Sequence, residues 1–254
     1  MSERKRTTLF LASACVLGAV LVCGLIDLPP IGDYRGPYGN VITQVAVYER
    51  HATDVVNAIN YDYRAFDTLG EEFILFASVL GVLLVFRPSG NESDQAEQKE
   101  QARLEDALPI SDALRVGMHA MAGLMIVFGF YIATHGQLTP GGGFQGGVIL
   151  ASVPLVVYLS GNVKAFNEII SHPLITTAEC VGAGGYAIIG AAALFFGVPF
   201  LTNFAPLGTT GDLFSSGNIA IISLCVGLEV TGGFIVLMQV YLEEIIEERL
   251  REES

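Results

Sequence analysis

HGQLTPGGGFQGG, residues 135–147, separates two apolar runs of the chain, residues 116–134 and 148–159. The stretch is rich in glycine, contains Pro140, and carries no formal charge apart from His135. Glycine adopts left-handed backbone without a steric penalty, and proline fixes φ and lacks an N–H donor. The pattern therefore predicts a tight, partly left-handed joint between two helices, for which a short helix-to-helix turn is the simplest interpretation.

The composition indicates a membrane protein. Of 254 residues, 52% are hydrophobic and only 15% are charged, whereas soluble domains average roughly 25% charged residues. A membrane-spanning helix needs roughly 20 apolar residues. Six candidate spans approach that length: residues 9–26, 72–86, 114–135, 144–159, 178–197 and 219–242.

The distribution of Lys and Arg predicts the orientation of these spans. If the N-terminus is cytoplasmic, most basic residues fall on the cytoplasmic side, as the positive-inside rule requires. The first run is longer than the apolar core of a signal peptide, so we expect a retained anchor. The predicted fold is an all-α integral membrane protein with about six transmembrane helices and both termini in the cytoplasm.

Charge and cysteine content exclude several function classes. The net charge of −13 argues against nucleic acid as a partner. The cysteines lie in or beside apolar spans without metal-ligand spacing, so we interpret Cys15, Cys23, Cys180 and Cys225 as small apolar fillers. The sequence has no nucleophile with a neighbouring base and no phosphate loop. It predicts neither an enzyme nor a cofactor or metal site.

The polar segments between the spans predict further elements. Residues 41–59 carry apolar side chains at helical spacing, which predicts an amphipathic helix lying either on the bilayer or against a partner. Residues 91–111 form an acidic linker, in which Ser111 is the predicted N-cap of the next span. The tail, residues 243–254, is a charged continuation of the last helix.

Glu229 is the one acid that the sequence places near mid-membrane. It is preceded by ten residues of the last apolar run, which places it roughly 15 Å along the helix. An ionised carboxylate there costs at least about 2.5–3.5 kcal/mol. Glu229 is therefore either an ion-coupled residue or a neutral acid hydrogen-bonded between helices, and Gly232 and Gly233 would allow a neighbour to approach it.

Other polar residues near span ends have both structural and functional interpretations. Glu71 is three residues after Thr68, a capping-box spacing, and Glu179 has the same relation to Thr176. We expect Glu179 to be a helix-start residue. Asp67 and Glu71 could instead offer hard oxygen ligands to Na⁺.

The two histidines of the third span are too far apart to bind one haem. His119 and His135 are 16 residues apart in one helix, roughly 24 Å along its axis. We expect the His135 side chain to form hydrogen bonds across the glycine-rich joint.

Two motifs carry a family resemblance. TPGGGFQGG, with His135 upstream, resembles the signature of the B-type chain of Mrp/Mnh-type multi-subunit cation/proton antiporters. YDYRAFDTLGE, residues 61–71, is similar to the FRGFDTLGE motif near the C-terminus of the A-type Mrp chain and in the small E-type chain of membrane-bound hydrogenases, except that Ala65 stands where that family often has glycine. The resemblance implies domains at 1–90 and 112–242, joined by the linker 91–111.

The resemblance also implies a function. It suggests an accessory subunit of a prokaryotic plasma-membrane complex that exchanges Na⁺ or a similar cation for H⁺, with other Mrp/Mnh-type subunits and membrane lipid as partners. The residues carried over are the motif positions Arg64, Asp67, Glu71, His135, Pro140, Gly141, Gly142, Gly143 and Gly147. The alternatives are a purely structural subunit of a redox complex related to complex I or hydrogenase, and a stand-alone carrier.

Overall fold

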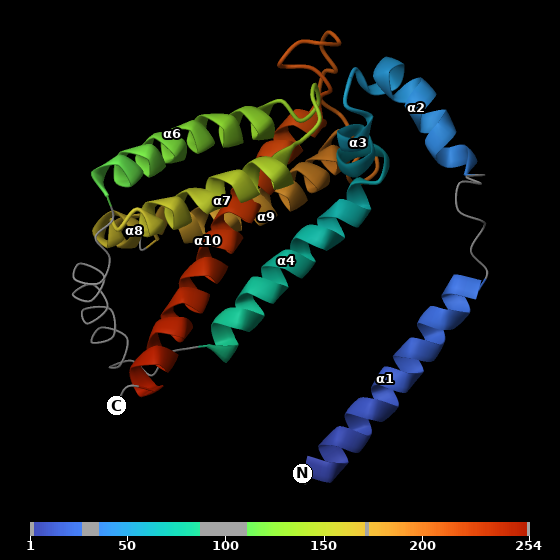
Figure 1. The fold of residues 1–254 in the computed structure, drawn as a ribbon. Coiled ribbons are helices and arrows are strands. Elements are labelled where there is room, and N and C mark those ends of the chain that lie inside the picture. The colour runs from blue at the N-terminus through green and yellow to red at the C-terminus, as the bar shows by residue number, and fades with distance from the viewer. Residues whose placement is uncertain (1–2, 27–35, 87–110, 171–172, 253–254) are drawn as a thin grey trace. The chain divides into compact units, whose positions relative to one another are not determined.

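The computed structural model describes residues 3–26, 36–86, 111–170 and 173–252. Its regular structure is helical in every described segment. The elements are α1 (Glu3–Ile26), α2 (Pro37–Arg50), α3 (Val55–Ala58), the π-helical turn η1 (Ile59–Tyr63), α4 (Ala65–Val85), α6 (Asp112–Thr134), α7 (Gly143–Leu159), α8 (Val163–Ile170), α9 (Pro173–Phe195) and α10 (Asn218–Glu252) (Figure 1). Most of the predicted linker lies outside the described residues.

The chain divides into two compact units, residues 1–41 and 42–254. The first contains α1, whose apolar side chains are exposed around almost its whole circumference. The second contains α2 from Ile42 onward and all of the later helices. Four segments in the described part are long and apolar enough to cross a membrane: Ala65–Val85, Asp112–Thr134, Lys164–Phe195 and Asn218–Leu242. Two shorter apolar helices, Phe10–Ile26 and Gly143–Leu159, complete the six predicted spans.

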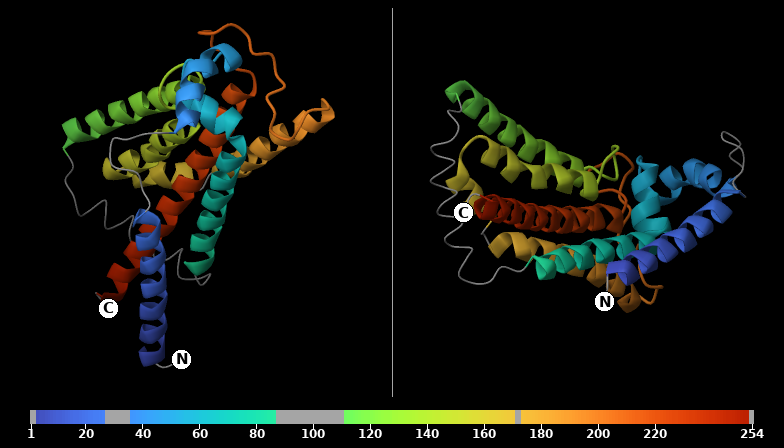
Figure 2. Two further views of the ribbon diagram at one scale, coloured as in Figure 1. Left: turned by 90° about the vertical axis from the view of Figure 1, so that its right-hand side faces the viewer. Right: turned by 60° about the horizontal axis from the view of Figure 1, so that its bottom comes forward.

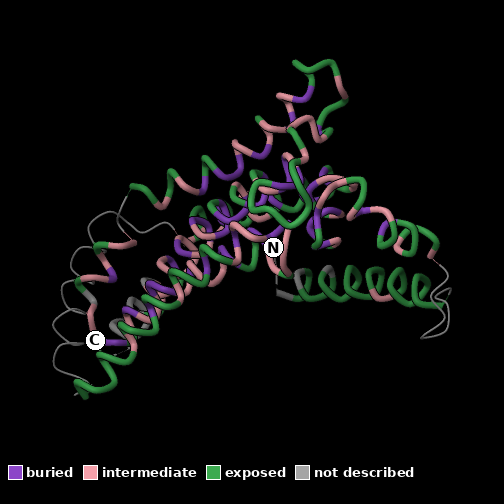
Figure 3. The backbone as a smooth tube through the Cα atoms, turned by 90° about the horizontal axis from the view of Figure 1, so that it is seen from above, coloured by how far each residue is buried: buried purple, intermediate pink, exposed green. Residues whose placement is uncertain are grey.

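Helix α10 is the centre of the second unit. It packs against α9, α7 and α4, and α6 packs on the far side of α7 (Figure 2). Buried residues accordingly concentrate where these helices meet, while their outer faces are exposed and apolar (Figure 3). Exposed apolar faces on long helices are what a bilayer requires, because lipid solvates them. The chain is therefore a multi-pass α-helical membrane protein.

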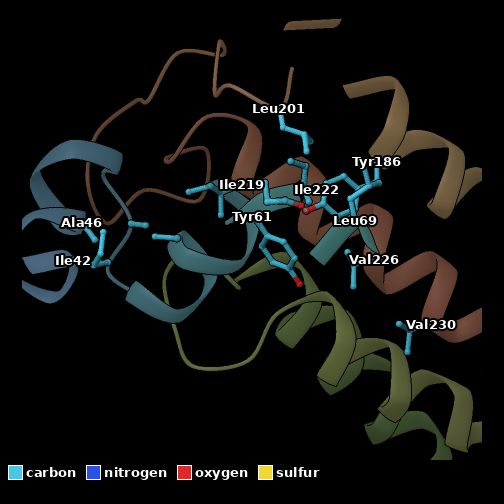
Figure 4. Close-up of a cluster of buried hydrophobic side chains, with 13 residues drawn as sticks. Ile42, Ala46, Tyr61, Leu69, Tyr186, Leu201, Ile219, Ile222, Val226 and Val230 are labelled. Carbon is cyan, nitrogen blue, oxygen red and sulfur yellow. Dashed lines mark hydrogen bonds between the residues drawn. The ribbon is translucent and has the colours of Figure 1, made fainter. Parts of the chain in front are cut away.

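One end of this unit carries the glycine-rich joint, which connects the last residue of α6 to the first of α7. We call it the joint end. The N-termini of α4, α7 and α10 and the C-termini of α6 and α9 all lie there (Figure 1). A cluster of buried apolar side chains holds α2, α3 and η1 onto this end through Ala46, Tyr61 and Ile219 (Figure 4).

Three local predictions were wrong. Residues 41–59 do not form one helix: α2 ends at Arg50, and His51 has φ 52° at the break. The capping box at Thr68 and Glu71 does not exist, because α4 already begins at Ala65. Likewise α9 begins at Pro173, so Glu179 is a buried interior residue rather than a helix-start residue. Both helices begin earlier in the chain than the sequence predicted.

Other expectations were confirmed. Ser111 caps α6, since its side chain accepts a hydrogen bond from the Leu114 N–H at 3.3 Å. The last helix continues without a break through the predicted tail as far as Glu252. The four cysteines are free thiols, of which Cys15, Cys23 and Cys180 are exposed and Cys225 is half-buried, so their predicted role as fillers stays a prediction.

Candidate functional site

The candidate site consists of three buried glutamates from three helices. Glu229 of α10 is 1% exposed, Glu72 of α4 is 4% exposed, and Glu179 of α9 is 5% exposed. The carboxyl groups of Glu72 and Glu229 face each other within electrostatic range, and that of Glu179 is also close to Glu229. We refer to these three side chains as the carboxyl series.

The three acids lie near one another where α4, α9 and α10 pack together. Glu72 follows the first residue of α4 by seven positions, and Glu229 follows the first residue of α10 by eleven. Glu179 lies opposite Gly232, three positions after Glu229, which is roughly 4.5 Å farther along α10. Glu72 and Glu179 are both within electrostatic range of Glu229.

Glycines bring α9 and α10 close enough to enclose these acids. A Cβ on Gly182 of α9 would overlap the backbone N of Glu229, and a Cβ on Gly232 of α10 would lie 2.8 Å from the Cβ of Glu179. Glu229 and Glu179 therefore each stand directly opposite a glycine of the neighbouring helix. The prediction that Gly232 allows close approach of a neighbour is confirmed.

The carboxyl series has no basic partner in the described part of the chain. Both carboxyl oxygens of Glu229, Oε2 of Glu72 and Oε1 of Glu179 are buried without a hydrogen bond. The ion pairs formed by described residues, Arg50 with Asp62 and Arg64 with Asp67, lie elsewhere. Buried carboxyls without partners are costly unless they are protonated or bind an ion or water.

The series does not form a single metal site. No group of three His, Cys, Asp or Glu side chains in the described residues has the geometry to hold one ion. Each carboxyl group can hold a proton or, when ionised, attract a cation.

The glycine-rich joint has the left-handed backbone that its sequence predicts. Gly141 and Gly142 have φ of 142° and 118°, and Gly142 is the N-cap of α7. The next residue, Gly143, packs so closely on α10 that a Cβ would overlap the carbonyl oxygen of Ser223. One turn later, Gly147 packs on Val230, where a Cβ would come within 2.8 Å. The joint therefore places the first turns of α7 in direct contact with α10.

The joint also binds the start of α3. Asp54 N donates to the Gln137 carbonyl at 3.2 Å, and Thr53 Oγ1 donates to the Leu138 carbonyl at 2.6 Å. Asn57 Nδ2 donates to the Gly141 carbonyl at 3.0 Å and to Asp54 Oδ2 at 2.5 Å. Three of these four hydrogen bonds reach backbone carbonyls of the joint, which fixes α3 over the start of α7.

The histidines lie away from the carboxyl series. The His135 ring does not bond across the joint as predicted, because its Nδ1 faces the Tyr131 carbonyl at 2.9 Å and the ring stacks on Tyr131 of its own helix. It is the backbone carbonyl of His135 that accepts hydrogen bonds from the joint, from the N–H groups of Leu138 and Thr139. His119 Nδ1 likewise faces the Arg115 carbonyl at 2.8 Å.

Three charged residues of the YDYRAFDTLGE motif, Arg64, Asp67 and Glu71, are exposed at the start of α4. Arg64 Nε donates to Asp67 Oδ2 at 2.6 Å, and both side chains are exposed. Glu71 is exposed as well, whereas its neighbour Glu72 is buried. Because adjacent helical residues point roughly 100° apart, the two acids face different surroundings. The structure does not bring Asp67 or Glu71 to the carboxyl series.

Sequence reasoning missed the row of polar side chains that leads to Glu72. The row consists of five buried side chains separated by three, four or seven residues, from the N-cap of α3 through η1 into α4: Asp54, Asn57, Tyr61, Thr68 and Glu72. That spacing is visible in the sequence. The predicted helical pattern ends at Ile59, because Thr68 and Glu71 were interpreted as a helix cap. With a cap at that point, the buried face of α3 and η1 does not continue into α4.

Residues 113–236 match the protein family described as a domain related to the MnhB subunit of Na⁺/H⁺ antiporter. The match covers the joint, Glu179 and Glu229 together. We call these matched residues, slightly less than half of the chain, the MnhB domain. The resemblance of the joint to the B-type chain of these antiporters is thereby confirmed.

Relatives and solved structures extend the likeness beyond the MnhB domain. A probable K⁺/H⁺ antiporter A/B subunit of Rhizobium meliloti is 30% identical over 80% of this chain, which corresponds to 21% of that relative's length. A chain of the membrane-bound sulfane sulfur reductase, an archaeal respiratory membrane complex, is 28% identical, with a TM-score of 0.68 over 93% of this chain and 98% of that one.

The fold also occurs in an Mrp complex. A chain of the complex from Dietzia sp. DQ12-45-1b gives a TM-score of 0.65 over 94% of this chain and 26% of that one, at 23% identity. The helices that precede the MnhB domain are therefore shared with these neighbours. Among the relatives described, the Rhizobium meliloti chain is the one named as an antiporter subunit, which agrees with the expectation of a transport role.

Proposed function

We propose that the chain is an accessory membrane subunit of a multi-subunit Mrp-type complex that exchanges Na⁺ or a similar cation for H⁺. Its MnhB domain and the antiporter relative support this assignment. Its partners are other Mrp/Mnh-type subunits, because exposed apolar faces on α4 and α6 leave room for neighbouring chains. The membrane is the plasma membrane of a prokaryote.

The carboxyl series is the observation that carries this proposal. Buried acids without basic partners mark ion or proton pathways in membrane proteins, because their cost is otherwise not offset. Glu72, Glu229 and Glu179 are three such acids, contributed by three helices that pack together. At each, a carboxyl group can hold a proton or, when ionised, a cation.

The same relatives support a division of the chain into two regions. We assign residues 1–90 to a region like the C-terminal part of the A-type chain and residues 112–242 to the B-like domain. The relative described as an A/B subunit supports this fusion. Glu72 comes from the first region and Glu179 and Glu229 from the second, so the carboxyl series exists only when the two regions pack together.

A redox-linked complex is the second candidate. It is favoured by the similarity to nearly the whole length of one chain of the sulfane sulfur reductase complex. The carboxyl series would have the same task there, with an oxidoreductase rather than an ion gradient as the driving force. Isolation of the complex in mild detergent would decide between the two by the presence or absence of iron–sulfur subunits.

Replacement of Glu229 by Gln tests ion coupling. The amide keeps the size of the side chain but cannot release a proton or bind a cation as a carboxylate. We expect Na⁺-dependent proton movement in inside-out vesicles to fall by at least about tenfold, because an amide does not replace an acid on an intramembrane ion path. The complex should assemble as before.

A scaffold role makes the opposite prediction. If this chain only holds the complex together, Glu229→Gln would leave exchange unchanged in a normally assembled complex. Asp67→Asn is the matched control, since Asp67 is an exposed acid of α4 that is paired with Arg64. We expect it to retain most of the exchange.

A further inference from the structure

We propose that residues 203–216 form a strap that closes the joint end of the row from Asp54 to Glu72, and that a cation reaches Glu72 from this end only when the strap is released. The strap belongs to the loop between α9 and α10, which is the orange loop at the joint end in Figure 1. The inference rests on the proposed function, because it assigns an entrance to the path on which the carboxyl series lies.

The strap is bonded to His51, which lies in the break between α2 and α3. Nδ1 of His51 donates to the Gly208 carbonyl of the strap at 2.6 Å. The His51 carbonyl in turn accepts from Ser216 Oγ of the strap at 2.9 Å. Asp54, the first residue of the polar row, follows His51 by three positions and is 8% exposed. The strap is therefore held close to the point where the row begins.

Two further side chains tie the strap to the joint and to η1. Gln137 Nε2 donates to the Leu213 carbonyl of the strap at 2.7 Å, while the Gln137 carbonyl accepts from the Asp54 N–H at 3.2 Å. Asn203 Nδ2 of the strap donates to Asp62 Oδ2 at 2.9 Å. Gln137 is 0% exposed. The strap, the joint and the beginning of the polar row consequently meet in one buried contact.

The strap has less to hold it than the helices that it connects. Residues 203–216 are non-helical, and residues 208–214 are all exposed. Within the strap, the Ser216 N–H donates to the Leu207 carbonyl at 2.8 Å. Segments with exposed backbone and few buried apolar contacts open at a lower free energy than packed helices do. The strap can thus be released while α9 and α10 stay packed.

The backbone is strained where the strap is fixed. The non-glycine residues of the described chain that have left-handed backbone are His51, Leu201 and Ser216, with φ of 52°, 64° and 70°. Ser216 and His51 are joined by a hydrogen bond, and Leu201 lies two residues before the strap. Such conformations persist only where surrounding contacts hold them, and they cluster at switch regions. Relief of this strain favours release of the strap.

Release of the strap uncovers neutral oxygen atoms. Gln137 Oε1 is buried without a hydrogen bond from the described residues. Ser215 is 1% exposed, and its hydroxyl oxygen is 3.3 Å from that of Ser216. Neutral oxygen atoms can replace part of the water shell of a small cation. The entrance therefore suits a cation such as Na⁺, which can pass from these atoms to Asp54.

A reversible cross-link between the strap and η1 tests whether the strap must open. Asn203→Cys and Asp62→Cys are combined, and a short cross-linker that reductant cleaves joins the two thiols, because the native side chains meet at 2.9 Å. We expect Na⁺-dependent proton movement by the complex to be lost in the linked protein and to return on reduction. A monofunctional reagent of the same chemistry, which modifies both thiols without joining them, is the control.

Thiol labelling of Ser215→Cys in the detergent-solubilised complex measures release of the strap without transport. Ser215 is buried, so a reagent reaches a thiol at this position only while the strap is released. His51→Ala removes the side-chain bond to Gly208, and we expect labelling to be about fivefold faster, as the loss of one hydrogen bond implies. His119→Ala is the control, because the His119 ring bonds to the Arg115 carbonyl within α6.

Three results would overturn the inference while the proposed function stands. They are exchange that continues in the linked protein, failure of the two thiols to link, and labelling of Ser215→Cys that is no faster with His51→Ala than with His119→Ala. If Glu72→Gln leaves exchange unchanged, the proposed function fails, and the inference that rests on it fails as well.

Discussion

Asn57 shows how one buried side chain joins the two regions of the protein. It is 2% exposed, and its amide donates both to Asp54 and to the carbonyl of Gly141. Gly142 is equally involved, since a Cβ there would lie 2.5 Å from Asn57 Oδ1. The pair explains why the joint needs glycine at a position with φ of 118°.

Asn57→Ala should destabilise the chain by about 1–3 kcal/mol, because the Gly141 carbonyl and Oδ2 of Asp54 both lose the donor that Asn57 provides. Thermal unfolding of the detergent-solubilised complex would measure this as a lowered midpoint. Gln145→Ala serves as the control, since Gln145 is exposed in the first turn of α7. Equal midpoints for the two variants would contradict the assigned role of Asn57.

At the scale of single residues, the sequence identified Glu229 as an acid inside an apolar helix but did not identify Glu72. Glu229 stands alone in a long apolar run, so its depth follows from counting residues. Glu72 follows Glu71 directly, and only the rotation of α4 decides which of the two faces α10. That rotation depends on where α4 begins, which the capping interpretation misplaced.

At the scale of helices, the contact between α9 and α10 depends on glycines that the sequence did not distinguish. Gly182 and Gly184 are two residues apart in α9. A Cβ on Gly182 would overlap the backbone of α10, whereas one on Gly184 would meet nothing within 4 Å. Small residues permit this close approach, which drives helix association in membranes.

Gly182→Ala should therefore weaken the packing of α9 on α10 by about 1–3 kcal/mol, the usual cost of overpacking. Gly184→Ala should be neutral, or slightly stabilising because alanine favours helix. Thermal stability of the two variants in the same detergent separates these effects. A Gly182→Ala protein as stable as Gly184→Ala would show that α9 and α10 do not pack at this glycine.

Helix positions were largely predictable, and helix contacts were not. Each of the six predicted spans corresponds to an apolar helix, because length and hydropathy are local properties. The order in which α6, α7, α10 and α4 lie beside one another depends on side chains far apart in sequence. The break between α2 and α3 was missed for a similar reason, since Asp54 caps α3 through the Val56 N–H at 2.9 Å while the apolar spacing continues across it.

At the scale of the whole molecule, the row from Asp54 to Glu72 and the carboxyl series form one buried polar line from the joint end inward. We propose, from the distribution of Lys and Arg, that the joint end faces away from the cytoplasm. The line would then begin on the outer side of the membrane. Its acids come from both of the regions that we propose for the chain, residues 1–90 and 112–242.

The most direct test of a role for the carboxyl series compares Glu72→Gln with Glu71→Gln in the assembled complex. Both changes remove one acid from adjacent positions of α4, but only Glu72 is buried beside Glu229. Na⁺-dependent proton movement across inside-out vesicles would be measured for both. We predict that Glu72→Gln loses exchange and Glu71→Gln retains it, whereas equal exchange in the two variants would contradict a role for the carboxyl series.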